Sequence, residues 1–308
     1  MENSTEITSF VLAAYGNIGQ LRYLYFTLII IWYLSIVFIN SALIVVIGMN
    51  RRLHEPMYMF LCSLLINEIY GSTTIYPCLM SQMFSDTHEV SLTTCFTQII
   101  CFYTSVSTEY CNFAAMAYDR YVSICYPLHY NVIMNSGKVY AIILLVWIYS
   151  IANFTFTVYF MAHWRFCGNV IDKIYCDIHS LHSLACSVPA ASRIYGLVYA
   201  AVTVFVPFVL ISFSYIKILI VCVKTSSEAK QKAVSTCAPQ IASMINFAIG
   251  CSFDIVQSRI DVTHVPDKLR ILLSVYLVVC QPVFSPVMYG LNLSKIRDAC
   301  KRFLCDKK

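Results

Sequence analysis

The chain has 308 residues, of which 59% are hydrophobic and only 12% are charged, with a formal net charge of +5 and a mean hydropathy of +0.69. Soluble domains carry about 25% charged residues, so this chain has too few charges to cover a water-facing surface. The composition therefore excludes a soluble domain and predicts a protein that lies in a lipid bilayer.

Seven predominantly apolar runs follow one another, each close to the roughly 20 residues that a membrane-spanning helix needs. The runs are 24–49, 57–81, 92–125, 138–161, 194–222, 233–256 and 269–290. We expect an all-α membrane protein whose seven-transmembrane helix bundle is a single domain over 1–308. In it, 1–23 is the N-terminal segment, 24–291 is the bundle, and 292–308 is a tail that forms a short amphipathic helix.

Lysine and arginine predict the orientation, because cytoplasmic loops are enriched in both residues. About twice as many of the 21 lie on the side of the tail as on the opposite side. We therefore expect a cytoplasmic tail and an extracellular N-terminus. The acidic start of the chain lacks the pattern of a cleaved signal peptide. A basic inner face suits anionic membrane lipid, so the charge requires no nucleic-acid partner.

Four of the 15 cysteines fall in the predicted extracellular region, where disulfides are expected: Cys95, Cys167, Cys176 and Cys186. Four cysteines allow three pairings, and spacing alone does not choose among them. Asn3 begins an extracellular glycosylation sequon with Ser4 and Thr5.

Asp119, Arg120 and Tyr121 end the third apolar run, in the stretch MAYDRYVSIC over 116–125. Charges at a membrane helix end are costly unless they lie at the interface or form a pair. We expect Asp119 to hold Arg120 at rest until another event releases it.

Five further motifs follow the expected helices in order. They are LHEPMY at 53–58, PLHY at 127–130, Ser214-Tyr215, KAVSTCAP at 232–239 and PVMYG at 286–290. Together with 116–125 they closely resemble the signature of odorant receptors, a branch of the rhodopsin-like G-protein-coupled receptors, from about residue 40 to residue 300. The segment 264–268 looks most like the fish-like class of these receptors.

The resemblance implies a plasma-membrane receptor that binds a small odorant in the outer half of the bundle. Such a receptor activates a stimulatory heterotrimeric G protein to raise cAMP and is not an enzyme. The resemblance also implies the disulfides Cys95–Cys176 and Cys167–Cys186. Cys300 and Cys305 lie in the basic tail, where palmitoylation and free thiols both stay open.

The resemblance gives Arg120 the role of a switch. After activation the sixth helix swings outward, and Arg120 helps to form the G-protein cleft near Tyr215 and Tyr289. The alternative is an arginine that anchors its helix by extending to the membrane surface.

Two carboxylates lie deep in the predicted membrane region. Glu68 is about 18 Å from Pro56, and Glu109 is about 16 Å from Arg120, at 1.5 Å per helical residue. The two acids therefore lie at matching depth on neighbouring helices. The family resemblance implies a cation site for sodium, which would be the only cofactor; the alternative is an acid pair that shares one proton.

Candidate ligand contacts lie in the outer turns of four helices, where apolar and a few polar side chains would surround a small molecule. They are Phe102, Tyr103, Val106, Ser107, Tyr199, Thr203, Cys251, Ser252, Ile255, Arg259, Val275 and Val279. Arg259 at the rim could clamp the carboxylate of an acidic odorant. The alternative, which we favour, is a rim arginine that pairs with Asp254, Asp261 or a lipid phosphate.

Two positions depart from the family pattern. Ser285 stands where these receptors usually carry asparagine, which predicts an altered polar network around Glu68 and Tyr289. Ala248 stands where tyrosine is usual, which predicts a pocket floor without that aromatic ring, and Gly250 would add local backbone freedom.

Two other functions remain open from the sequence. One is a rhodopsin-like receptor for a metabolite that is not an odorant. The other is a transporter or channel, which would show paired, interrupted helices in two related halves; the sequence has no such symmetry.

Overall fold

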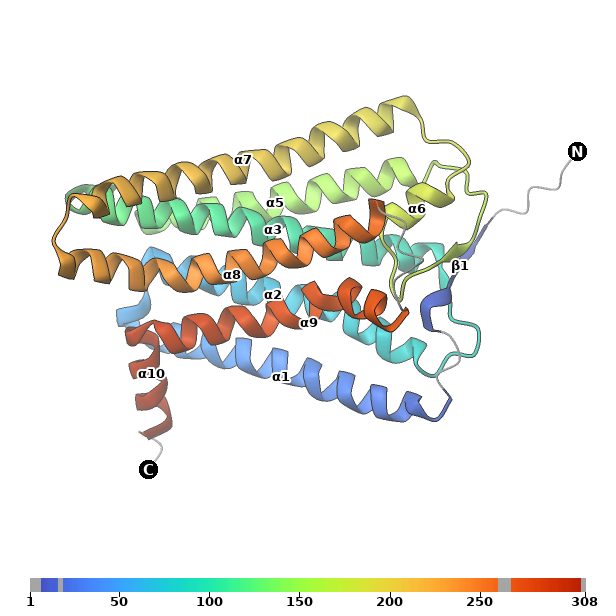
Figure 1. Cartoon of the computed structure of the whole chain (residues 1–308), viewed down its shortest axis with the longest axis horizontal. Coiled ribbons are helices and arrows are strands. Elements are labelled where there is room, and N and C mark those ends of the chain that lie inside the picture. Colours follow the sequence, from blue (N-terminus) through green and yellow to red (C-terminus); the bar gives the residue numbers. More distant parts are fainter. Residues whose placement is uncertain (1–6, 16–18, 260–266, 306–308) are drawn as a thin grey trace, which may run out of the picture.

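The computed structural model describes residues 7–15, 19–259 and 267–305. Seven long helices run side by side through this part of the chain (Figure 1). They are α1 (Leu21–Met49), α2 (Pro56–Gln82), α3 (Leu92–Cys125), α5 (Ser136–Met161), α7 (Ala190–Val223), α8 (Ser227–Arg259) and α9 (Asp267–Asn292). Each predicted apolar run lies inside one of them. The amphipathic α10 (Ser294–Cys305) turns away from the end of α9, as expected for the tail.

Short elements fill the connections between the long helices. They are η1 (Ala13–Tyr15), η2 (Arg51–Leu53), η3 (Pro127–His129), α4 (Tyr130–Ile133) and α6 (Ile178–Leu184). One end of the bundle carries α6 and a small β-sheet, and the other carries α10 (Figure 1). We call these the sheet end and the α10 end.

Local sequence signals explain where several helices begin. Ser91 caps α3 by accepting a hydrogen bond from the Thr94 amide at 3.2 Å, and Asn135 caps α5 through the Lys138 amide at 2.9 Å. Pro56 begins α2, where its missing N–H leaves no hydrogen bond unmade. Internal prolines interrupt the backbone hydrogen bonding of α2, α7, α8 and α9 and favour bends there.

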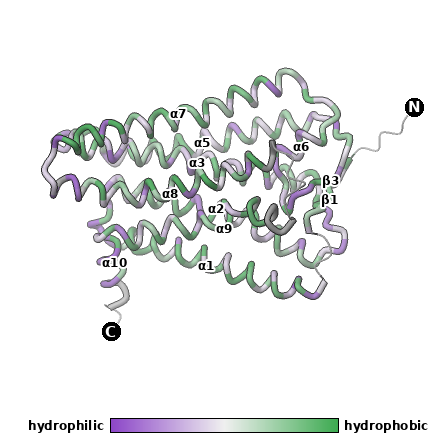
Figure 2. Tube along the Cα trace, in the orientation of Figure 1, coloured by the Kyte–Doolittle hydropathy of each residue, from purple (hydrophilic) through white to green (hydrophobic). Residues whose placement is uncertain are grey.

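The outer surface of the bundle is apolar. Phe38 on α1 and Phe205 on α7 are 73% and 65% exposed, and Figure 2 shows hydrophobic residues along α5 and α7. By length and composition, α1, α5, α7 and the 275–292 part of α9 are each apolar enough to cross a membrane. The remaining long helices, α2, α3 and α8, carry polar residues that point into the bundle.

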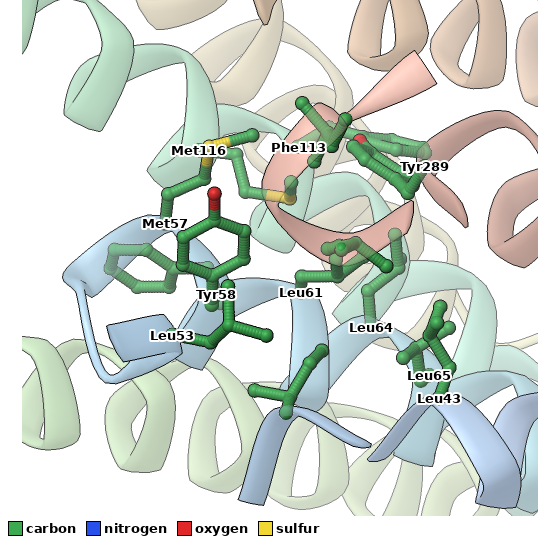
Figure 3. Close-up of a cluster of buried hydrophobic side chains, with 14 of the residues drawn as sticks. Leu43, Leu53, Met57, Tyr58, Leu61, Leu64, Leu65, Phe113, Met116 and Tyr289 are labelled. Atoms are coloured by element: carbon green, nitrogen blue, oxygen red, sulfur yellow. The ribbon is translucent and has the colours of Figure 1, made fainter. Parts of the chain in front are cut away.

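The helices are held by close packing, because lipid tails are as apolar as leucine and burial from lipid gains little. Near the α10 end, leucines and methionines of α2 meet Phe113 and Met116 of α3 and Tyr289 of α9 (Figure 3). Two glycines mark close contacts between helices. A Cβ on Gly71 would lie 2.3 Å from Ser105 Oγ, and one on Gly250 would lie 2.8 Å from Leu277 Cδ1.

Gly250 therefore supports close packing of α8 against α9, and this differs from the expectation that it adds backbone freedom. The helix continues through it without a break. The close contact with Leu277 requires a residue without a side chain at position 250.

The N-terminal segment forms the central strand of a three-stranded sheet. Strand β1 (Ser9–Leu12) pairs antiparallel with β2 (Glu89–Ser91) and parallel with β3 (Val170–Ile171). Phe10 and Leu12 are fully buried, and the Tyr15 hydroxyl donates to the Ile174 carbonyl at 2.9 Å. The start of the chain thereby covers the sheet end of the bundle, which the sequence analysis did not anticipate.

Candidate ligand and signalling sites

A cavity lies between α2, α3 and α9 in the sheet half of the bundle. Its lining consists of Glu68, Gly71, Ser72, Phe102, Ser105, Val106, Glu109, Leu277, Val278, Gln281 and Pro282. The structure brings together Glu68 and Glu109, which are only 3% and 4% exposed, and it places the predicted ligand contacts Phe102 and Val106 on the same cavity wall. The cavity thus combines apolar walls with a strongly polar floor.

Glu109 begins a hydrogen-bonded chain that crosses to α9 and α8. Gln281 Nε2 donates to Glu109 Oε1 at 2.5 Å and to Ser285 Oγ at 3.1 Å. Ser285 Oγ lies 2.7 Å from Ser243 Oγ on α8. Ser285 therefore takes part in the polar network in place of the usual asparagine.

The same glutamine reaches α8 by a second route. Asn246 Nδ2 donates to Gln281 Oε1 at 2.5 Å, and the Tyr276 hydroxyl donates to Asn246 Oδ1 at 2.7 Å. Sequence reasoning missed Gln281 and Asn246. Both are polar side chains within apolar spans, and such residues usually face the bundle interior, so this signal could have found them.

Two polar atoms on the cavity wall have no hydrogen-bond partner among the described residues: Glu68 Oε1 and Ser72 Oγ. Together with the Glu109 carboxylate they form an oxygen-rich donor set of the kind that hard cations prefer. The described part of the chain contains no cluster of three or more His, Cys, Asp or Glu side chains that could hold a metal ion. A cation here would therefore be shared between two carboxylates and neutral oxygens.

Several other predicted ligand contacts face neighbouring helices and do not line this cavity. Ser107 accepts a hydrogen bond from Ser150 at 3.0 Å, and Thr203 bonds the Tyr149 hydroxyl at 3.0 Å. Tyr199 packs against Phe154. These polar and aromatic contacts hold α5 to α3 and α7.

The remaining predicted contacts lie around the cavity. Tyr103 packs between Phe102 and Phe154, and Cys251, Val275 and Val279 are half-buried. Ser252 is exposed and bonds its own helix at the Ala248 carbonyl. The side chains of Ile255 and Arg259 lie outside the described residues, as does Asn3.

Ala248 is exposed and does not form the pocket floor, which corrects the expectation for this position. The adjacent Phe247 is buried instead and contacts the rings of Tyr110 and Phe113. An aromatic ring is therefore present between α8 and α3, one residue before the position at which the family pattern predicts it.

Arg120 and Asp119 form a buried ion pair near the α10 end of α3. Arg120 Nε donates to Asp119 Oδ2 at 3.0 Å, and the Tyr130 hydroxyl donates to Asp119 Oδ1 at 2.7 Å. Burial and the Asp119 carboxylate raise the pKa of Tyr130, so its hydroxyl keeps the proton that it donates. Asp119 is fully buried, and each of its two carboxylate oxygens accepts a hydrogen bond.

Aromatic side chains surround this ion pair. Tyr121 packs against Phe213 of α7, and Tyr215 packs with Cys237 of α8 in one apolar cluster. Tyr289 lies beside Phe113 (Figure 3). Among the described residues, the hydroxyls of Tyr215 and Tyr289 have no hydrogen-bond partner, so each can form a new hydrogen bond.

Two disulfides hold the sheet end. Cys95 of α3 pairs with Cys176, and Cys167 pairs with Cys186, as the resemblance implied. At the other end, Cys300 of α10 is half-buried against the apolar core, and the Cys305 side chain lies outside the described residues.

Comparison with known proteins agrees with this geometry. The family model described as "Olfactory receptor" matches residues 28–307. The chain belongs to the olfactory receptor family. Human olfactory receptor 11A1 is 31% identical over 98% of this chain and 95% of its own length. Human olfactory receptor 6B1 is 32% identical over 98% of this chain and 96% of its own length.

The fold of this olfactory receptor is similar to that in the crystal structure of squid rhodopsin. The TM-score is 0.73 at 14% identity, and the match covers 92% of this chain and 86% of that one. The expected seven-helix receptor fold is therefore confirmed, and the olfactory receptor is a multi-pass membrane protein and a signalling receptor, not an enzyme.

Proposed function

We propose that this olfactory receptor binds a small odorant in the sheet half of the bundle and activates a stimulatory G protein that raises cAMP. In this proposal it lies in the plasma membrane with the sheet end and N-terminus outside the cell. The excess of lysine and arginine at the α10 end supports that orientation. The two disulfides at the sheet end also support it, because disulfides persist in oxidising surroundings.

The observation that carries the proposal is the hydrogen-bonded path from the cavity to α8. An odorant that enters here must separate Phe102 and Val106 of α3 from Leu277 of α9, and so press on α9 beside Gln281. Gln281 is bonded to Glu109 on one side and to Asn246 of α8 on the other. A small shift of Gln281 therefore changes the contacts of α8 directly. The changed contacts let α8 move outward at the α10 end. This movement frees Arg120 from Asp119 and opens the G-protein cleft beside Tyr215 and Tyr289.

The test is a cAMP measurement in cells that express the receptor with an olfactory-type stimulatory G protein. The cells are challenged with amino acids, short carboxylic acids, bile-acid-like steroids and neutral volatiles. We expect at least one class to raise cAMP without ligand uptake or membrane current. Verified surface expression with no cAMP response to any class would contradict the proposed coupling.

We also propose that sodium binds between Glu68 and Glu109 and favours the resting state. The unpartnered Glu68 Oε1 and Ser72 Oγ support the site. Glu68→Gln and Glu109→Gln each remove one carboxylate charge at nearly constant shape. We expect both variants to lose the sodium dependence of basal cAMP, measured with sodium replaced by an organic cation. Unchanged sodium sensitivity in both variants would rule out the site, and Glu55→Gln serves as the control at an exposed carboxylate.

A further inference from the structure

A lysine at the sheet end is held between two carboxylates that come from different elements. Lys173 lies just after β3, and its Nζ donates to Asp177 Oδ2 at 3.0 Å and to Asp254 Oδ1 at 2.9 Å. Asp177 is the N-cap of α6, where it also accepts the Ser180 amide at 3.3 Å. Asp254 belongs to α8. The ammonium therefore connects the loop before α6 to the helix that the proposed function requires to move.

These charges are largely withdrawn from water. The side chain of Lys173 is 12% exposed, that of Asp177 is 0% exposed and that of Asp254 is 19% exposed. Lys173 Nζ also lies 5.7 Å from the centre of the Tyr175 ring. Burial lowers the pKa of Lys173, but the two carboxylates more than offset this and raise it. The lysine therefore stays charged, and the ion pairs are stronger than exposed ones would be.

The loop side of this contact is fixed. Cys176 is bonded to Cys95 of α3, and its backbone amide donates to Gln98 Oε1 of the same helix at 2.9 Å. Strand β3 is paired with β1. Residues 170–177 therefore move with α3 and cannot follow α8.

The α8 side of the contact is held by a different neighbour, α9. α8 packs mainly on α9 and makes far fewer contacts with α3 and α7. Any movement of α8 that shifts its sheet end away from the loop separates Asp254 from Lys173 and leaves a partly buried carboxylate without its cation. That separation has an energetic cost, because an uncompensated charge of low exposure is unfavourable.

We infer that Lys173 is a positioning residue: through Asp254 it ties the sheet end of α8 to the disulfide-anchored loop and stabilises the resting receptor. This inference rests on the proposed function, in which α8 moves on activation. Lys173, Asp177 and Asp254 together are called the Lys173 latch. It acts at the opposite end of the bundle from the Asp119–Arg120 pair.

Lys173→Gln and Asp254→Asn each open the latch while keeping a polar side chain of similar size. We expect basal cAMP per surface receptor to rise about five-fold in each, because an ion pair worth about 1 kcal/mol changes a two-state equilibrium by that factor. The exchanged pair, Lys173→Asp with Asp254→Lys, keeps one lysine and two aspartates at the contact, with the lysine now on α8, and should return basal cAMP toward the wild-type level. Lys295→Gln is the matched control, since its ion pair with Glu55 lies at the α10 end and is half-exposed.

Hydrogen exchange of the purified receptor tests the latch without any signalling readout. Lys173→Gln should speed amide exchange in residues 170–177 and in the last turns of α8, and leave α5 unchanged. No change in exchange would overturn the latch. Suppose that Lys173→Gln speeds exchange but leaves basal cAMP at the wild-type level, in a receptor whose cAMP response depends on Arg120. The Lys173 latch would then not control activation. Absence of any Arg120-dependent cAMP would instead contradict the proposed function, and exchange alone would then decide whether Lys173 holds α8.

Discussion

Replacing Arg120 with alanine is expected to abolish G-protein activation while the receptor still reaches the cell surface. The guanidinium is the only part of the Asp119–Arg120 pair that can leave and offer several donors to a partner, since Asp119 is fully buried. The Tyr130 hydroxyl remains on Asp119 Oδ1 after the change, so the buried carboxylate keeps one hydrogen bond. The measurement is cAMP per surface receptor, with surface receptor counted by an antibody to an N-terminal tag.

Two companion variants separate a switch from an anchor. Asp119→Asn removes the counter-charge and leaves Arg120 free, so basal cAMP should rise. Arg120→Lys keeps the positive charge but loses the planar fork, so it should couple weakly even though a lysine can also anchor a helix at the membrane surface. Normal coupling in Arg120→Ala would show that the arginine only anchors α3.

Loss of the Cys95–Cys176 disulfide is expected to be the largest single destabilisation of the sheet end. The two cysteines are 81 residues apart, against 19 for Cys167–Cys186. By loop-closure entropy alone, removing the longer link costs about 4.5 kcal/mol and removing the shorter one about 3 kcal/mol. The double variant Cys95→Ser with Cys176→Ser should therefore lower the melting temperature of the purified receptor more than Cys167→Ser with Cys186→Ser.

The same comparison reports on the loop that carries Lys173. Without its bond to Cys95, that loop should no longer hold β3 in the sheet or Asp254 of α8 in place. Surface expression of the Cys95→Ser, Cys176→Ser variant should therefore fall further than the loss of loop-closure entropy alone predicts. Equal melting temperatures for the two double variants would show that α3 holds the loop by packing alone.

The seven helices could be predicted because each must bury its backbone polar groups within an apolar length set by the bilayer. Their ends were less predictable. α8 begins at Ser227, six residues before the apolar run at 233, and α7 begins at Ala190 rather than 194. Polar residues can continue a helix into water beyond the membrane, where hydropathy gives no signal.

Depth along a helix was predictable for the candidate site, whereas rotation was not. The rise per residue is enough to place Glu68 and Glu109 at one level, and the structure brings them to one cavity. Which neighbour a side chain faces depends on the rotation of each helix about its own axis. This is why Tyr199 and Thr203 contact α5, and why Phe247 rather than Ala248 reaches α3.

The position of β1 also has a consequence for the order in which the receptor is assembled. The chain emerges from the ribosome N-terminus first, yet Tyr15 bonds Ile174, which is 159 residues further along. The first strand can pair with β2 once α1 and α2 are made, but its other partner, β3, follows only after four long helices are made and inserted. Only then can Phe10 and Leu12 be covered, so closure of the sheet end is a late step of biogenesis. A chain that stalls before Val170 would leave these two apolar side chains exposed to chaperones and proteases.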